Sequence, residues 1–300
     1  MSVANEQSIA GVLPANATKE RSRWQSALRL GRRYPRLVIF AVFLTVLLAI
    51  CLLAPVIAPY NPRETNTQER LESPSSRHWM GTDQLGRDIY SRVLYGGRVS
   101  IPLPMMAVVI SASLGIVLGA VSGFYGGALD LTLGRVVDAQ LAFPELVLLL
   151  LIANVFRPNL FGLMLIIGFT GYTNTYRLAR GQVLQAREFD FVRAADSIGA
   201  TTPRILMRHV IPNILNPLFV TWTVTAGSAV LLLATLTFLG LGPQAGTPDW
   251  GAMFNDGLNN IRLQPWLMFG PGLAVISTAF AFFMLGDALR DATDPRLRSR

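Results

Sequence analysis

Long stretches without a charged side chain constrain this sequence more than any other feature. No Asp, Glu, Lys or Arg occurs in residues 37–61 or 99–129. A helix of about 20 apolar residues crosses the roughly 30 Å hydrocarbon core of a membrane, where every backbone polar group must be hydrogen-bonded within the protein. Hydrophobic residues make up 51% of the 300-residue chain, charged residues make up 15%, and the mean hydropathy is +0.42. The sequence therefore predicts an all-α polytopic membrane protein.

Apolar runs of the required length predict six transmembrane helices. We place them at about 37–58, 101–123, 131–156, 160–176, 214–239 and 264–286. The first run begins after 36 residues and has no small-residue cleavage pattern behind it, so we expect an uncleaved anchor rather than a signal peptide. In the second run, Gly115, Gly119 and Gly123 recur at every fourth residue, a spacing that would let a neighbouring helix approach closely.

The distribution of basic residues predicts the orientation of these helices. With six spans both termini lie on one side, and that side holds 18 of the 26 basic residues, which makes it the cytoplasmic one. The expected organisation is a cytoplasmic tail (1–36), the first transmembrane helix (37–58), an extracytoplasmic loop (59–99), a transmembrane core (100–286) and a cytoplasmic C-terminal tail (287–300).

Composition excludes several kinds of site. The net charge of +8 could suggest a nucleic-acid partner, but the charges lie between apolar stretches, as they do in Arg-rich cytoplasmic loops, and we expect no nucleic acid. Cys51 is the only cysteine and His78 and His209 are the only histidines, which is too few for a metal site. Lys19 is the only lysine and follows no glycine-rich loop, which excludes a phosphate-binding loop for ATP on this chain.

The 59–99 loop is too long for a simple turn, and its second half has a helical pattern. Thr82 or Asp83 is the expected N-cap. Leu85, Ile89 and Val93 then recur at four-residue spacing. We expect a short helix that lies along the membrane surface. It is either a solvated connection or a docking surface for an external partner.

The cytoplasmic segment 180–213 predicts two helices joined by a turn. The signals are apolar residues at helical spacing, a terminating glycine, capping threonines and flanking prolines, namely Phe191, Ala194, Ala195, Ile198, Gly199, Thr201 or Thr202, Pro203 and Pro212. We expect the glycine to end the first helix and Pro212 to stop the second. The tip between the helices, 196–204, would be exposed to a partner protein, unless the segment is an amphipathic loop that rests on the bilayer.

Five motifs resemble those of a known transporter family. The segment Arg193-Ala-Ala-x3-Gly199-x9-His209-Val-Ile-Pro212 is similar to the EAA loop of membrane subunits in binding-protein-dependent ABC importers. The other four are Gly81-Thr-Asp-Gln-Leu-Gly-Arg-Asp88, Leu141-Ala-Phe-Pro144, Thr247-Pro-Asp-Trp-Gly251 and Gly286-Asp-Ala-Leu-Arg-Asp-Ala-Thr-Asp-Pro-Arg296. Together they resemble the C-type permease of the dipeptide, oligopeptide and nickel branch over nearly everything after about residue 30. The loop departs from the general motif, because Arg193 replaces a glutamate, His209 an aliphatic residue and Ile211 a leucine.

The resemblance implies a six-helix, non-catalytic permease subunit of the bacterial inner membrane, with both termini cytoplasmic and no cofactor on this chain. Its implied partners are a B-type permease subunit in a heterodimer, two ATPase subunits that hold ATP and Mg, and an extracytoplasmic solute-binding protein. The implied ATPase-coupling residues are Arg193, Ala194, Ala195, Asp196, Ser197, Gly199, Ala200, Thr201, Thr202, Pro203 and Arg204. The implied docking residues for the binding protein are Gly81, Thr82, Asp83, Gly86, Arg87 and Asp88. Members of this branch handle dipeptides, oligopeptides, glutathione, nickel chelates or opine-like compounds, and the sequence does not separate these solutes.

Glu145 bears on two alternative functions. An acidic residue within a predicted span is a candidate functional site, either on the solute pathway or in helix packing or a cytoplasmic cavity. A gradient-driven secondary transporter is one alternative function, but it usually needs intramembrane carboxylates or broken helices, and Glu145 is the one candidate. A membrane enzyme is another, and it would need a nucleophile with a base, a metal cluster or paired carboxylates. Asp138 and Glu145, seven residues apart, could share a helix face but have no further partners.

Overall fold

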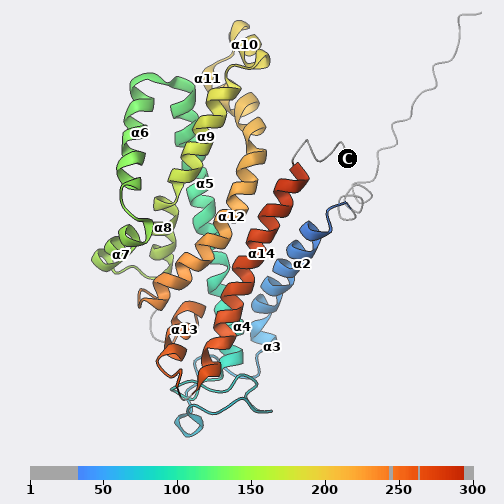
Figure 1. Ribbon diagram of the computed structural model, residues 1–300, viewed down its shortest axis with the longest axis vertical. Coiled ribbons are helices and arrows are strands. Elements are labelled where there is room, and N and C mark those ends of the chain that lie inside the picture. Colours follow the sequence, from blue (N-terminus) through green and yellow to red (C-terminus); the bar gives the residue numbers. More distant parts are fainter. Residues whose placement is uncertain (1–32, 243–245, 263, 294–300) are drawn as a thin grey trace, which may run out of the picture. The chain divides into compact units, whose positions relative to one another are not determined.

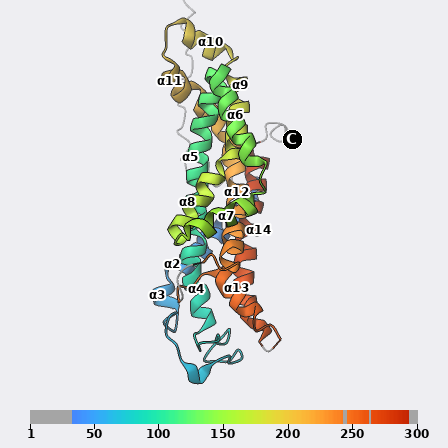
Figure 2. The same ribbon diagram turned by 90° about the vertical axis from the view of Figure 1, so that its left-hand side faces the viewer.

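The computed structural model describes residues 33–242, 246–262 and 264–293. Within these ranges the regular elements are helices, and the one β-type pairing is an isolated bridge between Thr82 and Asp88. In chain order (Figures 1 and 2) the elements are α2 (Pro35–Leu52), α3 (Ala54–Ile57), η1 (Thr67–Glu69), α4 (Ile89–Ser100), α5 (Pro102–Tyr125), α6 (Gly127–Leu141), α7 (Glu145–Phe156), α8 (Leu160–Thr170), α9 (Tyr172–Ala186), α10 (Asp190–Ser197), α11 (Thr202–Ile205), η2 (Leu206–Val210), α12 (Ile211–Phe238), α13 (Trp250–Leu258), η3 (Pro265–Met268) and α14 (Phe269–Thr293). The predicted 1–36 tail falls outside the described residues except for its last four, and so does the end of the C-terminal tail from residue 294 onward.

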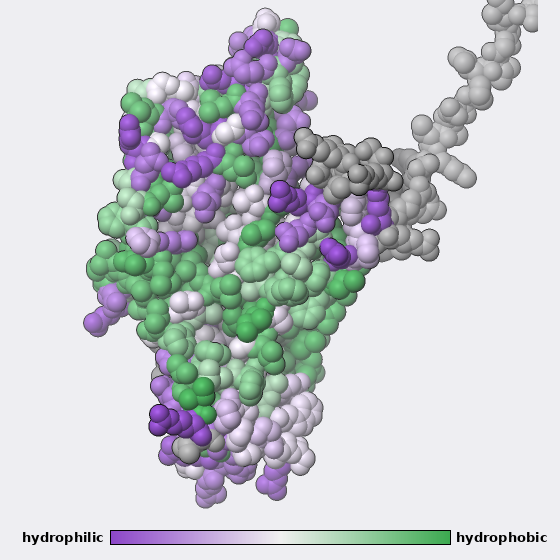
Figure 3. Space-filling model, in the orientation of Figure 1, coloured by the Kyte–Doolittle hydropathy of each residue, from purple (hydrophilic) through white to green (hydrophobic). Residues whose placement is uncertain are grey.

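Four helical stretches among the described residues are long and apolar enough to cross a membrane: Pro35–Leu52, Ile89–Tyr125, Thr202–Phe238 and Pro265–Thr293. On the face shown in Figure 3, apolar residues form a broad band between two polar ends. The predicted all-α polytopic fold is therefore confirmed. The count of six spans stays a prediction, because the region predicted at 160–176 is divided between α8, with 11 residues, and α9, with 15.

The third predicted span is not a straight helix. The 131–156 region consists of α6 and α7, whose axes are bent by 85° at the intervening residues 142–144, so that the pair counts as one broken span at most. Pro144 explains the break. Proline has no N–H to continue the hydrogen-bond ladder, and its ring disfavours the helical conformation of the preceding residue, Phe143.

Pro212 does not stop the second helix of the cytoplasmic segment, contrary to the prediction. The helix runs from α11 through η2, which is a π-helical turn, into α12, and the N–H of Ile211 donates to the carbonyl of Leu206 five residues earlier. A π turn takes up one extra residue and widens the backbone locally. Pro212 then lies in the first turn of α12, and the carbonyl that its missing N–H would have met lies within the widened π turn.

The region after the fifth span contains a helix that the sequence analysis did not predict. Helix α13 follows the glycine-rich stretch 240–246 and begins at an N-cap, where the Asp249 carboxylate accepts the N–H of Ala252 at 3.0 Å. The last helix, α14, also continues to Thr293, seven residues beyond the predicted end at 286. The predicted tail at 287–300 is therefore helical in its first half.

The most extensive contact between two helices is that of α5 with α9, and the predicted glycine stripe lies in it. A Cβ placed on Gly115 would lie 2.5 Å from the Thr175 Cβ, and one placed on Gly123 would lie 2.8 Å from the Arg180 carbonyl oxygen. Only glycine leaves room for backbones this close. The predicted role of this spacing in helix packing is thus confirmed.

Helix α2 has the opposite character. Among its 18 residues only Cys51 is buried. Its contacts are a small cluster around Trp250 and an edge-to-face ring pair between Phe40 and Phe280, whose centroids are 5.9 Å apart. Most of its apolar surface faces outward, as expected for a helix surrounded by lipid.

We expect Gly119→Leu to force α5 and α9 apart and to lower the free energy of unfolding by about 1–3 kcal/mol, the usual cost of overpacking. A Cβ at position 119 would lie 2.6 Å from the Tyr176 carbonyl oxygen, a backbone atom that cannot rotate away. The measurement is the fraction of purified protein that stays monodisperse after heating in detergent. Gly181→Ala in α9 is the matched control, because a Cβ there meets no atom within 4 Å. Equal heat resistance of Gly119→Leu and the wild type would contradict the close packing.

Candidate functional site

Three parts of the structure bring the predicted functional residues together. The elbow, residues 187–205, lies at one end of the helices with α10 and α11 (Figure 1). The outer loop, residues 58–88, lies at the opposite end beside α3 and α4. Between these ends, α5, α8, α9 and α12 border a groove that also receives Glu145.

The elbow reverses direction at Gly199. This residue has a φ of +77°, which glycine adopts without strain. Its N–H donates to the Asp196 carbonyl at 2.9 Å, and the N–H of Ala200 donates to the Ala195 carbonyl at 3.1 Å, as in a Schellman C-cap. The next helix begins at Thr202, with Pro203 in its first turn. The predicted pair of helices joined by a glycine turn is confirmed.

One face of the elbow is buried, and the other is open to solvent. Val192 and Ala195 of α10 pack into a core cluster with Ala186 of α9 and Ile205 of α11. Ile198, at the tip, is 85% exposed. The predicted coupling residues divide accordingly: Ala195 is buried, Ala200 and Thr202 are partly buried, and Arg193, Ala194, Asp196, Ser197, Gly199, Thr201, Pro203 and Arg204 are exposed. The tip therefore offers a mixed polar and apolar surface to a partner.

Arg193, which replaces the glutamate of the general motif, has an acidic partner within the elbow. Its Nη2 lies 2.7 Å from Oε2 of Glu188, and Nε of Arg187 lies 3.2 Å from the other carboxylate oxygen. The hydrogen bond from Arg193, followed by that from Arg187, holds the pKa of the Glu188 carboxyl below its ordinary value. The elbow thus keeps a local pair of opposite charges beside its exposed tip.

The helix that follows the outer loop begins later than predicted. Its N-cap is Asp88, whose carboxylate accepts the N–H of Ser91 at 2.7 Å, and α4 starts at Ile89. Asp83 instead accepts the N–H groups of Leu85 and Arg87, which builds a tight turn before the helix. Helix α4 is also buried along much of its length, so it is not the surface-lying helix that we expected.

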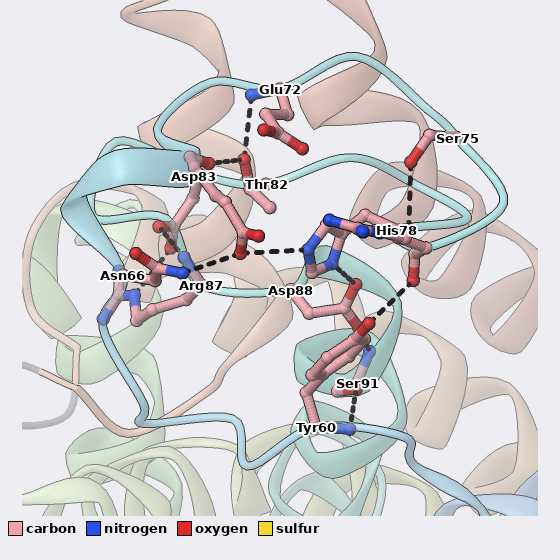
Figure 4. A network of polar contacts seen from close by, with 12 residues as sticks. Tyr60, Asn66, Glu72, Ser75, His78, Thr82, Asp83, Arg87, Asp88 and Ser91 are labelled. Carbon is pink, nitrogen blue, oxygen red and sulfur yellow. Dashed lines mark hydrogen bonds and ion pairs between the residues drawn. The ribbon is translucent and has the colours of Figure 1, made fainter.

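Buried charged residues organise the outer loop (Figure 4). Arg87 Nε lies 2.7 Å from Asp83 Oδ2, Arg92 Nε lies 3.6 Å from the same oxygen, and Arg92 Nη1 donates to the Pro62 carbonyl at 3.1 Å. The predicted docking residues Gly81, Thr82, Asp83, Gly86, Arg87 and Asp88 are all buried. These six residues therefore shape the loop, and a docked protein would contact their exposed neighbours instead.

His78 joins the start of α4 to the rest of the outer loop. The ring is 3% exposed, its Nδ1 lies 2.8 Å from Asp88 Oδ1, and it stacks on Tyr60 with centroids 4.7 Å apart. Nε2 lies 3.5 Å from the Glu69 carboxylate. Within the described part of the chain, no group of three or more His, Cys, Asp or Glu side chains could hold a metal ion. The contacts of His78 are those of a residue that organises a loop.

The groove has a volume of about 540 Å³ and is lined by both polar and apolar side chains. Its polar lining consists of Ser111, Glu145, Asn174, Thr221, Thr225, Ser228 and Thr235. The four hydroxyl residues of α12 recur at intervals of three, four or seven, which places them on one helix face. Glu145 is the one charged side chain among the lining residues. The groove can therefore hold a polar solute and offers it a single negative charge.

Glu145 lies in a different setting from the one predicted. It is the exposed first residue of α7, directly after Pro144, rather than a side chain inside a continuous span. Asp138 lies on α6, beyond the 85° bend, and its carboxylate is 2.8 Å from Nη2 of Arg177. The two acids therefore lie on separate helices and do not share one helix face.

A polar cluster between α5, α6 and α9 was not predicted from the sequence. Arg180 of α9 binds Asp130 of α6 through two bonds, Nε to Oδ1 at 2.5 Å and Nη2 to Oδ2 at 2.6 Å. Ser122 of α5 donates to the same Asp130 carboxylate, and its oxygen lies 2.8 Å from the Tyr176 hydroxyl. No local spacing could have indicated this contact, because Asp130 and Arg180 are 50 residues apart in the chain.

Comparison with known proteins gives two matching family models. Residues 115–299 match the model described as binding-protein-dependent transport system inner membrane component. Residues 22–74 match the model described as the N-terminal TM domain of oligopeptide transport permease C. The two matches together cover the first membrane helix, the elbow and the groove lining except Ala107, Val108 and Ser111.

Curated relatives match over most of their length. The dipeptide transport system permease protein DppC of Alkalihalophilus pseudofirmus is 36% identical over 278 residues, which is 93% of this chain and 91% of that protein. The probable D,D-dipeptide transport system permease protein DdpC of Escherichia coli is 39% identical over 262 residues, 87% of this chain and 88% of that protein. The glutathione transport system permease protein GsiD of Pectobacterium atrosepticum is 33% identical over 295 residues, 98% of each chain.

We expect Asp83→Asn to loosen the outer loop, because it leaves Arg87 and Arg92 buried without their shared carboxylate. Breaking a buried ion pair in this way costs about 3–5 kcal/mol. The measurement is the rate of tryptic cleavage after Arg77 in protein held in lipid nanodiscs, which should rise. Glu64→Gln is the matched control, because it removes the same charge from an exposed side chain of the same loop. If both variants resist trypsin like the wild type, the ion pairs do not hold the loop.

Proposed function

The chain belongs to the family of binding-protein-dependent transport system inner membrane components, and on this premise we propose that it forms half of the membrane pathway of an ATP-driven importer of peptides or similar small solutes. Relatives at 33% to 39% identity are permease proteins of dipeptide, D,D-dipeptide and glutathione transport systems. The chain is accordingly a permease subunit of an ABC importer rather than a gradient-driven secondary transporter. In the proposal, ATP is hydrolysed on two separate ATPase subunits.

One observation carries the proposal: α9 joins the exposed elbow to the groove. At its C-terminal end, Ala186 packs in the same core cluster as Val192 of the elbow. At its N-terminal end, Asn174 and the preceding Gly171 line the groove. A protein that pushes on the elbow therefore acts on the groove through one helix, which is the arrangement that alternating access requires.

The groove also supports a second membrane subunit. Its polar wall is open on one side, so a solute bound there would be enclosed only when another protein covers it. We infer a B-type permease subunit in that place, so that the solute pathway lies between the two chains. Glu145 and the hydroxyl groups of α12 would then contact the solute, with hydrogen bonds suited to peptide groups and a charge suited to an ammonium group.

The proposed orientation places the elbow in the cytoplasm and the outer loop outside it. In this arrangement α8 and α9 together form one crossing, α6 and α7 form another, and the total of six puts both termini in the cytoplasm. The excess of basic residues on the elbow side supports this orientation.

The extracytoplasmic solute-binding protein would dock on the outer loop. The buried ion pairs of that loop fix its shape, and Trp79 and Leu85 project from it, with 63% and 45% of their surfaces exposed. Trp79 lies against Tyr90, with ring centroids 4.8 Å apart, which gives it a defined position. A large aromatic side chain held in this way is a suitable anchor for a protein interface.

Cysteine labelling tests the orientation. In a Cys51→Ser background, we expect Ser75→Cys in the outer loop to react with a membrane-impermeant maleimide in intact spheroplasts. Ser197→Cys in the elbow should react only after the membrane is permeabilised. Both side chains are exposed, so each is accessible on its own side of the membrane. The reverse pattern of labelling would contradict the orientation.

Ile198→Asp tests coupling at the elbow. A charge at this exposed apolar tip should weaken binding of the ATPase subunits at least about tenfold, which corresponds to about 1.4 kcal/mol. ATP-dependent uptake of a labelled dipeptide into proteoliposomes should fall with it, whereas membrane insertion should not change. Ile198→Val is the matched control, because it keeps an apolar tip. Wild-type binding and uptake by Ile198→Asp would remove the elbow from the ATPase contact.

A further inference from the structure

Helix α6 is held by its ends and by polar contacts rather than by core packing. Among its 15 residues only Val137 is buried. It begins at a pair of left-handed glycines, Gly126 with a φ of +65° and Gly127 with a φ of +60°. It ends at residues 142–144, after which the chain bends by 85°. Because glycine tolerates large changes in φ and ψ and the bend lacks continuous helix bonds, both ends of α6 can act as joints.

The contact that fixes α6 nearest its first joint is the Asp130–Arg180 pair. It is bidentate, with N–O distances of 2.5 and 2.6 Å, and its side chains are 19% and 38% exposed. Bidentate pairs of this kind define geometry as well as contributing attraction. Ser122 of α5 and the hydroxyl of Tyr176 extend the contact, so that α6, α5 and α9 meet at one carboxylate.

Two further contacts hold α6, one to α9 and one to the last residue of α8. Arg177 Nη2 lies 2.8 Å from Asp138 Oδ1, with both side chains more than half exposed. Beyond it, Gln140 Nε2 donates to the Thr170 carbonyl at 2.5 Å, just before the start of α9. Asp130 and Asp138 of α6 pair with Arg180 and Arg177 of α9, so higher residue numbers on α6 meet lower residue numbers on α9. The two helices therefore run antiparallel and are joined at successive points.

These contacts connect the moving parts of the proposed transporter. Helix α9 shares a core cluster with the elbow at one end and lines the groove at the other. Helix α6 leads through the 142–144 bend to Glu145, which also lines the groove. Figures 1 and 2 show α6 alongside α9 and α7 at the level of the groove helices. A displacement of α9 can therefore reach Glu145 through α6, in addition to the packing of α7 on α8.

We propose that the Asp130–Arg180 and Asp138–Arg177 ion pairs form a latch, the α6 latch, which makes α6 follow α9 when the elbow moves and so carries that movement to Glu145. The inference rests on the proposed function, because it needs an ATPase to move the elbow. Asp130 and Arg180 are positioning residues in this scheme, since neither contacts the solute. The latch adds a second route from elbow to groove, separate from the direct packing of α9 on α5.

Distances between two labels test the latch itself. In a Cys51→Ser background, spin labels at Gly134→Cys on α6 and Gly181→Cys on α9 occupy positions where a Cβ meets no atom within 4 Å. In the full complex we expect one narrow distance distribution, with and without ATP on the ATPase subunits. Asp130→Asn should broaden it. The exchange of Asp130→Arg with Arg180→Asp should make it narrow again.

The number of solute molecules imported per ATP hydrolysed tests the role of the latch. In proteoliposomes with the complete complex and a labelled dipeptide, Asp130→Asn should lower this ratio about fivefold or more, in the range of ordinary coupling between sites, while ATP hydrolysis stays near the wild-type rate. Asp138→Asn should lower it by a smaller factor, because its ion pair is exposed. Arg135→Gln, on the same helix and in no ion pair of the described structure, should match the wild type.

Each result decides one question. An unchanged label distance in Asp130→Asn would overturn the latch, and so would a broadened distance with an unchanged import ratio in both aspartate variants. If Asp130→Asn fails to assemble, the label distance and the import ratio are both measured on Asp138→Asn instead. If the wild-type complex imports no solute with ATP, the proposed function fails, and the label distance alone then decides whether the latch exists.

Discussion

The close approach of α5 and α9 determines where the groove and the elbow of this protein lie. Lipid tails are as apolar as the side chains that they replace, so helices associate in a bilayer through close packing and polar contacts rather than through the hydrophobic effect. The stripe from Gly115 to Gly123 brings the two backbones together. With α9 fixed in this way, Tyr176 lies against Ser122, Asn174 lines the groove and Ala186 lies beneath the elbow.

Features that depend on local sequence were predicted well. Apolar length predicted the all-α membrane fold, the glycine interval predicted a close helix contact, and Gly199 with Pro203 predicted the elbow. Each of these is decided by residues a few positions apart. The five motifs also indicated the family, since family members keep residue types in order along the chain and not only in space.

Features that depend on distant residues were not predicted. The N-cap of α4 is Asp88 rather than Thr82 or Asp83. Asp83 binds two arginines instead, and the Thr82 side chain is hydrogen-bonded to the backbone of residues 69 and 72. The motif of the six docking residues is visible in the sequence, but their burial depends on contacts with other parts of the chain and could not be predicted. The Asp130–Arg180 pair and the role of Glu145 beyond the bend likewise depend on helices that meet only after folding.

Because α2 packs loosely on the rest of the protein, its position depends on the lipid around it. At about 1.5 Å per residue, its 18 residues span about 27 Å, slightly less than the roughly 30 Å core of a typical bilayer. The 37-residue helical stretches have length to spare and can tilt, whereas α2 has little, and α2 has only one buried residue of its own. Changes in membrane thickness therefore act first on this helix: thicker bilayers must thin around it, and thinner ones relieve the mismatch. Lipid composition, through the thickness of the membrane, therefore changes the force that the bilayer exerts on α2.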